Sequence, residues 1–456
     1  MAENVIEGPV VRERTFFGQP MGLAYLSFTE TWERFSYYGM TALLVLYMSQ
    51  SLLLPGHVEN IGGFAGFRAA LEGVFGPMTP LALASQIYGL YTGFVYFTPV
   101  FGGFIADRWI GRRNAVALGA VLMSAGHIAM AFDQSFLLAL ALLIVGCGFL
   151  KGNISAQVGA LYPLDDGEGR TRGYAIYSMG INVGAVVGPL ACGLLAQIWG
   201  WHVGFGLAGV LMLIGLATYL AGYRYLPEQG PRAAPEVRER LTPHQWRVTA
   251  GLTLVMALTI FQSIIYYQNS NIALVWIEKF VDLNLLGFHV PVAWFNSIDP
   301  FVSIVCVPFL LGLWRWQDKH GGEPSEIGKI ATGALIAALA NLFLVLATLT
   351  GPRSSVLFPI VYDMLLGLAF LYYWPPVLAL VSRAAPPQLR ATLMGSVFLT
   401  LFAGNLIIGW IGGFYEKMGP TGFWGMQVVI GVAGAALSFV LMRPLERLLL
   451  PEDKAA

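Results

Sequence analysis

The chain of 456 residues is 56% hydrophobic and only 11% charged, and its formal net charge is zero. Because soluble domains carry about 25% charged residues, this composition predicts an integral membrane protein. The apolar runs are about 20 residues long, which favours membrane-spanning helices over the short alternating strands of a barrel. The zero net charge argues against a nucleic-acid partner. The three cysteines all lie in apolar segments and indicate neither a disulfide framework nor a metal site.

Twelve membrane-spanning helices are predicted along the chain. The first six cover 21–50, 84–106, 113–133, 136–161, 172–199 and 202–223. The second six cover 247–280, 291–314, 326–350, 355–382, 391–416 and 421–444. The loop between the first two spans is long enough to carry a short surface helix.

A proline-rich linker divides these spans six and six. Residues 224–246 hold four prolines and mixed charges, and they form the longest connection predicted on the cytoplasmic side. The chain is therefore expected to contain an N-terminal bundle (1–223), this linker and a C-terminal bundle (247–456). The expected class is an all-α membrane protein with two six-helix bundles, and transporters of this kind bind substrate between the bundles.

The distribution of Lys and Arg predicts that both termini are cytoplasmic. Of the 26 such residues, twenty fall in loops on the side of the N-terminus, four fall in the opposite loops, and Arg34 and Lys151 lie within spans. Positive residues gather on the cytoplasmic side of membrane proteins, and a miscounted span would destroy this asymmetry. The expected location is a bacterial inner membrane.

Three ionisable residues, Glu30, Glu33 and Arg34, lie within the apolar first span. A charge at the centre of a bilayer costs on the order of 3 kcal/mol, so such residues usually face a cavity and pair with one another. On a helix, Glu30 and Arg34 are i,i+4 neighbours. The same broad face continues with Tyr37, Tyr38 and Thr41. This stripe predicts a functional surface, and the alternative is an ion pair that only fixes helix packing.

A glycine- and arginine-rich loop follows the second span. It reads GGFIADRWIGRR over residues 102–113, where glycines permit close helix approach and a tight turn. It resembles the motif between spans two and three of the major facilitator superfamily, where the motif acts as a conformational latch. The residues that would form the latch are Gly103, Asp107, Arg108, Gly111 and Arg112. A basic loop that only sets orientation is the alternative.

Spans four and five each carry a polar residue of interest. Lys151 is the only lysine within a span of the first half, and a desolvated lysine needs a carboxylate partner or a ligand carboxylate. Its alternative is a side chain that extends to the inner surface. Asn182 lies between Gly180 and Gly184, where helices can approach closely, so its alternative is a structural hydrogen bond.

The chain resembles the proton-coupled oligopeptide transporter family of that superfamily. The signature ExxERFxYYG is present from Glu30 to Gly39, Lys151 begins the stretch KGNIS, and Gly180 begins GINVG. The stretches 291–300 and 394–405 look like the family's spans eight and eleven. The resemblance covers most of the chain, and its motifs are most specific in the first half.

The resemblance implies a proton-driven symporter that imports di- and tripeptides by alternating access. Protons would be the coupling ion, without any cofactor, and we expect a functional monomer in the lipid bilayer. Proton coupling would involve Glu30, Glu33, Arg34 and Lys151. The residues expected to bind substrate in the first half are Arg34, Tyr37, Tyr38, Tyr91, Lys151 and Asn182.

The second half departs from the family pattern. Thr41 stands where members commonly have an arginine in span one, and Tyr267 stands where its carboxylate partner in span seven is expected, so both ends of a clamp between the bundles are missing together. Phe370 replaces the glutamate of span ten that would meet the peptide amino group. The tryptophans expected in spans seven and eleven fall at Ser263 and Val397.

We infer from these losses that the carboxylate of the second half has moved to Asp299, with Asp363 as the weaker candidate. Asp299 precedes Pro300, where helix hydrogen bonding is expected to break, and it stands where the family has an asparagine. It should be partnered, for example by Lys151, or protonated. We therefore expect Asp299 to take part in proton coupling and substrate binding, and the alternative is a polar residue beside a kink.

One alternative function remains open. A proton-coupled transporter of the same superfamily for another small organic solute fits the losses in the second half. An enzyme or receptor on this scaffold is not expected, because no nucleophile–base pair, metal cluster or phosphate-binding loop is recognisable in the sequence.

Overall fold

The computed structural model describes residues 15–163, 166–227, 240–285 and 287–449. The helices of the first half are α1 (Met21–Tyr47), α2 (Phe64–Phe75), α3 (Pro80–Ile105), α4 (Arg112–Ala129), α5 (Phe136–Ala160), α6 (Gly167–Trp199) and α7 (Trp201–Gly222). Those of the second half are α8 (Pro243–Tyr266), α9 (Ile272–Phe280), α10 (Ile298–His320), α11 (Glu326–Thr348), α12 (Leu357–Ala384), α13 (Arg390–Gly412) and α14 (Tyr415–Leu449).

Short elements complete the described chain. Two hairpins pair β1 (Thr15–Phe16) with β2 (Gln19–Pro20), and β3 (Asn284–Leu285) with β4 (Phe288–His289), both antiparallel. Single π turns cover Met48–Leu52 and Ala106–Ile110. Short 3-10 turns cover Val58–Asn60, Asp133–Ser135, Tyr223–Tyr225, Tyr267–Ser270 (η6) and Val292–Ser297 (η7).

The described residues contain twelve helices of 18 residues or more, in agreement with the twelve predicted spans. Ten of them are long and apolar enough to cross a membrane by length and composition. The other two are α1, which carries the charges of Glu30, Glu33 and Arg34, and α4, which is 18 residues long and begins with two arginines. Helices suit this setting because they satisfy their backbone hydrogen bonds internally.

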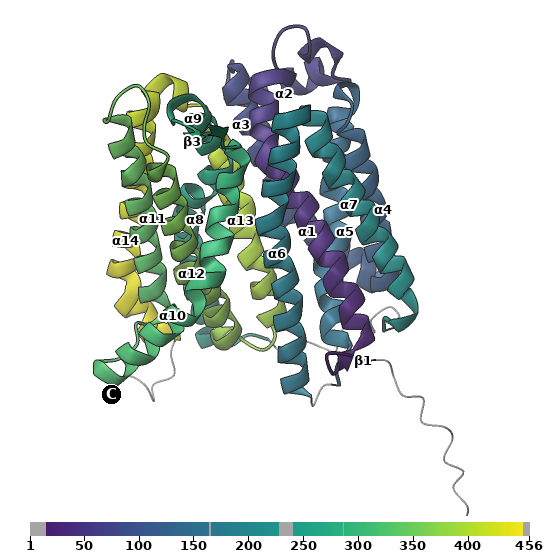
Figure 1. The fold of residues 1–456 in the computed structure, drawn as a ribbon. Helices are drawn as coiled ribbons and strands as arrows, with labels where there is room; N and C mark the ends of the chain where they lie inside the picture. Colours follow the sequence, from purple (N-terminus) through teal and green to yellow (C-terminus); the bar gives the residue numbers. More distant parts are fainter. Residues whose placement is uncertain (1–14, 164–165, 228–239, 286, 450–456) are drawn as a thin grey trace, which may run out of the picture.

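The twelve helices form two bundles that stand side by side (Figure 1). In the first bundle α1 packs against α6 and α7, and α5 packs against α3 and α4. In the second, α11 packs against α12 and α14, and α8 packs against α14. Glycines allow close approach within a bundle, as at Gly102, where an added Cβ would stand 2.0 Å from the carbonyl oxygen of Gly148. Residues 228–239 of the predicted linker lie outside the described residues.

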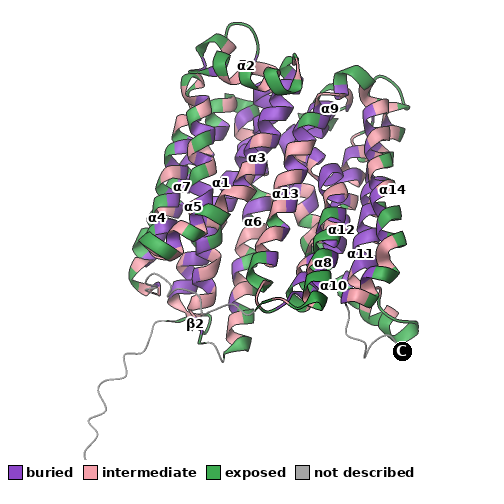
Figure 2. Ribbon diagram, turned by 180° about the vertical axis from the view of Figure 1, so that it is seen from behind, coloured by how far each residue is buried: buried purple, intermediate pink, exposed green. Residues whose placement is uncertain are grey.

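Buried residues line the inner faces of the helices and exposed residues cover the outer faces (Figure 2). Large apolar side chains are among the most exposed, including Phe309 at 73% and Val440 at 74%. Such an apolar outer surface is expected where a lipid bilayer replaces water. We call the two ends of the molecule the α2 end, after the surface helix in the predicted loop, and the opposite end, where α3 ends and α13 begins.

Two sequence expectations about the second half were wrong. The seventh span is not one helix, because Asn271 has non-helical backbone angles (φ −119°, ψ −107°) and separates α8 and η6 from α9. Pro300 does not break a helix, because it lies in the first turn of α10. There the amide hydrogen that proline lacks has no partner to lose.

Candidate functional site

A cavity of about 600 Å³ lies between the two bundles. Its polar and aromatic lining from the first half comprises Glu30, Arg34, Tyr37, Tyr38, Thr41, Tyr88, Thr92, Tyr96, Lys151, Ser155, Tyr177 and Asn182. The corresponding lining from the second half comprises Tyr266, Tyr267, Asn269, Ser270, Asn296, Asp299, Ser303, Phe370, Trp374, Phe398 and Asn405. A volume of 300–1,000 Å³ is about the usual range for small-molecule sites.

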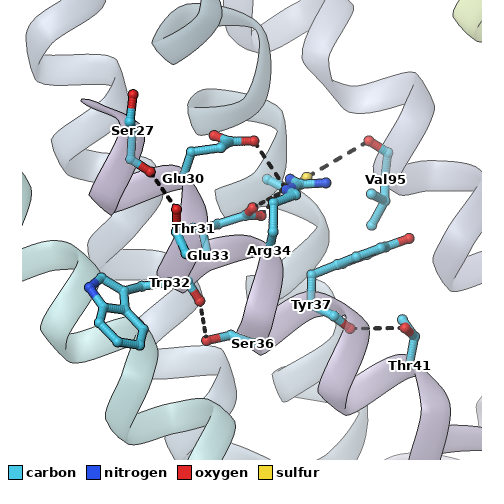
Figure 3. A network of polar contacts seen from close by, with 11 residues as sticks. Ser27, Glu30, Thr31, Trp32, Glu33, Arg34, Ser36, Tyr37, Thr41 and Val95 are labelled. Atoms are coloured by element: carbon cyan, nitrogen blue, oxygen red, sulfur yellow. Dashed lines mark hydrogen bonds and ion pairs between the residues drawn. The ribbon is translucent and has the colours of Figure 1, made fainter. Parts of the chain in front are cut away.

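The wall formed by α1 carries a buried ion cluster (Figure 3). Arg34 Nε lies 3.1 Å from Glu30 Oε1, and Arg34 Nη2 donates to Glu33 Oε1 at 2.7 Å. Arg34 Nε also pairs with the second oxygen of Glu33, so that glutamate is bound in a bidentate manner. All three side chains are at most 4% exposed. Two carboxylates therefore share one guanidinium, and one proton would make the cluster neutral.

The two glutamates of this cluster are not equivalent. Glu30 lines the cavity, and its Oε2 has no hydrogen-bond partner within the described part of the chain. Glu33 is fully buried behind Arg34 and does not line the cavity. Tyr177 of α6 lies beside Glu30 in the cavity lining, and it was not predicted as a site residue from the sequence. Glu30 is thus the carboxyl of the cluster that is nearest to solvent and substrate.

Lys151 of α5 faces the cavity from the first bundle. Its Nζ lies 4.2 Å from the centre of the Tyr96 ring and 5.8 Å from that of Tyr37, in the range of cation–π contacts. No carboxylate forms an ion pair with it among the described residues. The expected pair with Asp299 is therefore not formed in this conformation, and Lys151 remains available to a ligand carboxylate.

Asp299 faces the cavity from the second bundle, in the first turn of α10. Its Oδ2 accepts hydrogen bonds from Tyr266 Oη at 2.6 Å and from Asn269 Nδ2 at 3.1 Å. Asn269 is oriented in turn by Ser270, whose hydroxyl donates to its Oδ1 at 2.9 Å. The sequence analysis missed these partners. The sequence feature that could have indicated these partners is a polar run, YYQNSN at 266–271, inside an otherwise apolar span.

The remaining predicted substrate residues divide into two groups. Tyr37, Tyr38 and Asn182 line the cavity as predicted from the resemblance. Tyr91 is absent from the lining and is 2% exposed, so that part of the prediction was wrong. On α3 the cavity wall is formed instead by Tyr88, Thr92 and Tyr96, which follow one another at intervals of four residues and so share one face of the helix. Asp363 is also absent from the lining, so Asp299 is the carboxyl that the second bundle presents to the cavity.

Neutral contacts join the bundles at the α2 end. Ser85 of α3 donates to the carbonyl of Gly409 on α13 at 3.1 Å and accepts from Asn271 at 2.7 Å. Nearer the cavity, Thr92 donates to Asn405 Oδ1 at 2.9 Å. Gly89 is in such close contact with α13 that an added Cβ would stand 2.5 Å from the carbonyl oxygen of Asn405.

A second contact closes the same end between α6 and η7. Trp294 Nε1 donates to the carbonyl of Leu190 at 2.9 Å, and Ser297 Oγ donates to that of Val186 at 2.7 Å. The cavity lining near the α2 end is buried, as at Thr41 (4% exposed), whereas Val100 and Phe398 toward the opposite end are 49% and 37% exposed. The cavity is therefore closed at the α2 end and opens toward the opposite end.

The two residues that replace the family's charged clamp both line the cavity. Thr41 donates to the carbonyl of Tyr37 at 2.9 Å, within its own helix. Tyr267 lies across the cavity, with its ring 6.4 Å from that of Tyr96. Hydrogen bonds and glycine packing at the α3–α13 and α6–η7 contacts therefore contribute to closure at the α2 end, together with hydrogen bonds from Thr79 to Glu416 and from Gln197 to the carbonyl of His289.

The predicted latch residues gather at the opposite end. Asp107 pairs with Arg112 at 2.9 Å, and the Arg108 guanidinium lies 5.8 Å from the ring centre of Phe104. Gly111 has φ +75°, a conformation that favours glycine, and it forms the turn into α4. An added Cβ at Gly103 would meet nothing within 4 Å. Their role as a latch stays a prediction.

Comparisons with known proteins match this architecture. Residues 34–409 match the family model of the Major Facilitator Superfamily. The chain is 28% identical to the peptide transporter YePEPT of Yersinia enterocolitica subsp. palearctica serotype O:3 (strain YE-P4), over 96% of each chain. It is also 28% identical to a di-/tripeptide transporter of Lactococcus lactis subsp. cremoris, over 96% of this chain and 98% of the relative.

Solved structures give the same result. A crystal structure of the peptide transporter POT in complex with sulfate superposes with a TM-score of 0.85 and 26% identity, over 96% of this chain and 98% of that one. A mutant of peptide transporter POT in complex with alafosfalin gives a TM-score of 0.84 and 27% identity, with the same coverage. The resemblance inferred from the first-half motifs is thereby confirmed.

Proposed function

The chain belongs to the major facilitator superfamily, and we propose that it is a proton-driven symporter that imports di- and tripeptides by alternating access. The observation that carries this proposal is the ion cluster of Glu30, Glu33 and Arg34, which is buried in the wall of a cavity between two bundles. The peptide transporters among its relatives support the substrate class. We also propose that the protein acts as a monomer in a bacterial inner membrane. Both termini would be cytoplasmic, and no cofactor would be needed.

Proton coupling follows from the charge of the cluster. With both glutamates ionised, the cluster has one uncompensated negative charge, which is costly in a buried site. A proton from outside neutralises it and binds to Glu30, whose Oε2 is unpartnered and whose side chain reaches the cavity. Protonation of Glu30 also loosens its hold on Arg34, which can then meet a substrate carboxylate. Each proton that moves with the field gains about 2.3 kcal/mol per 100 mV.

Substrate recognition uses opposite charges on opposite walls. Lys151 and Arg34 on the first bundle attract the peptide carboxylate, and Asp299 on the second bundle attracts the peptide ammonium group. Asp299 is held in place by Tyr266 and Asn269, so it does not depend on a protein cation. The aromatic side chains between these walls leave apolar surface for varied peptide side chains. A short zwitterion that can reach both walls fits this arrangement best.

Alternating access follows from the two bundles, 1–223 and 247–456, which rock about the site. With the α2 end outside, as the Lys and Arg distribution predicts, the closed contacts of α3 with α13 and of α6 with η7 describe the inward-open state. The Asp107–Arg112 pair would then belong to a latch that closes in the outward-open state. Lys151 and Asp299 face one cavity from opposite bundles, so substrate binding can draw the bundles together.

Uptake by proteoliposomes tests this proposal. Purified protein is reconstituted, the outside is made acidic relative to the lumen, and accumulation of labelled dialanine is followed. The proposal predicts accumulation above the external concentration, competition by di- and tripeptides, and weaker competition by N-acetylated or C-amidated dialanine as matched controls. Accumulation of an unrelated organic solute with no competition by peptides would favour the alternative substrate class and contradict peptide import.

A further inference from the structure

Asp363 is a buried carboxyl that the proposed mechanism does not use. It lies in α12, is 2% exposed, and its Oδ2 has no hydrogen-bond partner within the described residues. It is seven residues before Phe370 on the same face of the helix, so it lies about 10 Å along the helix from that cavity-lining residue, toward the α2 end. Asp363 is therefore nearer the α2 end than Phe370 and does not belong to the cavity lining.

The surroundings of Asp363 contain one charged neighbour. Asp299 of α10 is the titratable group that interacts with it from the neighbouring helices, and Tyr362 lies next to it on its own helix. From α8, Tyr266 faces Asp299, and no Lys, Arg or His of the described residues interacts with Asp363. An ionised Asp363 would thus be a second buried negative charge with no cation beside it.

Asp363 is close to the contacts that close the α2 end. Gly367, one helical turn from Asp363, is so close to α10 that an added Cβ would stand 2.5 Å from the carbonyl oxygen of Asp299. Two residues before Asp299, Ser297 donates to the carbonyl of Val186 on α6. A charge at Asp363 would therefore act on the very segment of α10 and η7 that seals against the first bundle.

Burial of an unpaired carboxylate is much more costly than burial of a protonated carboxyl group. We propose that Asp363 is a proton-binding site on the external side whose protonation is required for the α2 end to close. In the outward-open state its carboxyl is hydrated and exchanges its proton with the outside. Closure traps the protonated form, and an ionised Asp363 holds the α2 end open. The inference rests on the proposed function only in taking the α2 end as external.

The proposal has a quantitative consequence. If the closed state binds one more proton than the open state, the open-to-closed ratio rises up to about tenfold per pH unit. The sign follows from the proton count, because raising external pH disfavours the state that holds the extra proton. Opening at the α2 end should therefore increase as external pH rises.

A single cysteine can report this opening. Ser85 is fully buried in the α3–α13 contact, so the Ser85→Cys side chain should react with an impermeant maleimide added outside only when the α2 end opens. The three native cysteines are first replaced by alanine. Rates are measured on intact cells from external pH 6 to 9 and divided by the rate for the same cysteine in denatured protein at the same pH.

The expected result is a normalised rate that rises with pH in the reporter protein. Asp363→Asn, which is neutral at every pH and similar in shape to the protonated acid, should lose most of that rise and stay closed. Asp363→Glu should keep it. Tyr362→Phe removes the neighbouring buried hydroxyl, which is likewise unpartnered, and is the matched control that should keep the full rise.

Four results would overturn the proposal: no pH dependence in the reporter protein, an unchanged rise in Asp363→Asn, fast reaction of Asp363→Asn at every pH, or equal loss of the rise in Tyr362→Phe. None of these depends on peptide transport. Failure of the inference is therefore distinguishable from failure of dialanine accumulation, which tests the function itself.

Discussion

Gly89 is the position where a single methyl group should change the conformational equilibrium. An added Cβ would stand 2.5 Å from the carbonyl oxygen of Asn405 and 2.7 Å from Gly409 Cα, both backbone atoms of α13. Carbon atoms pack at about 3.5–4.0 Å, so α3 and α13 would have to separate by about 1 Å. This contact joins the two bundles, so Gly89→Ala should destabilise the state closed at the α2 end and leave the bundles themselves unchanged.

The size of the effect follows from overpacking, which costs about 1–3 kcal/mol. Since 1.4 kcal/mol is a factor of ten, the open-to-closed ratio should rise about 5- to 150-fold. The Ser85→Cys reporter measures this ratio through its rate of alkylation from outside. Gly312→Ala on α10 is the matched control, because an added Cβ there meets nothing within 4 Å. Its alkylation rate should equal that of the reporter alone.

The reasoning would be refuted if Gly89→Ala alkylates no faster than Gly312→Ala while both proteins fold and express equally. That result would mean that the α3–α13 contact does not hold the α2 end closed. Thermal unfolding of the purified variants checks the folding condition.

Three further substitutions test the site. Glu33→Gln leaves Arg34 paired with Glu30 alone, and this neutral pair takes up no proton. Dialanine counterflow should therefore survive, while uptake driven by a pH gradient is lost. Unchanged gradient-driven uptake would argue against a role of the ion cluster in proton coupling. Asp299→Asn keeps an acceptor for Tyr266 but loses the charge that attracts the peptide ammonium group, so counterflow and accumulation of dialanine should both fall, and normal accumulation would remove Asp299 from the mechanism. Lys151→Gln should raise the KM for dialanine roughly 10- to 100-fold, which corresponds to about 1.4–2.8 kcal/mol of binding free energy. The KM for C-amidated dialanine should change little. An equal rise in KM for both compounds would exclude carboxylate binding by Lys151.

The global fold was predictable because the bilayer imposes it. Apolar runs of about 20 residues and the asymmetry of Lys and Arg determine the number of spans and their expected orientation. Those signals do not report interruptions within an apolar run. The break at Asn271 was therefore missed, and with it the segment just before the break that carries Tyr266 and Asn269, the partners of Asp299.

The candidate site was predictable where residues belong to a motif on one helix. Glu30 and Arg34 form the expected i,i+4 pair, and Tyr37 and Tyr38 face the cavity with Arg34. The position of Tyr91 away from the cavity depends on how α3 is rotated about its axis within the bundle. That rotation could not be predicted from the single sequence. Contacts between the bundles join residues far apart in the sequence, such as Ser85 and Gly409, which are 324 positions apart, and they needed the structure.

Proton movement during peptide uptake tests the central claim most directly. Proteoliposomes that contain the protein and an internal pH-sensitive dye, with equal pH on both sides and an inside-negative potential, receive dialanine outside. The account predicts that the lumen acidifies on addition of dialanine, with the response absent in Glu33→Gln. Entry of dialanine without acidification would contradict proton-coupled symport by this chain.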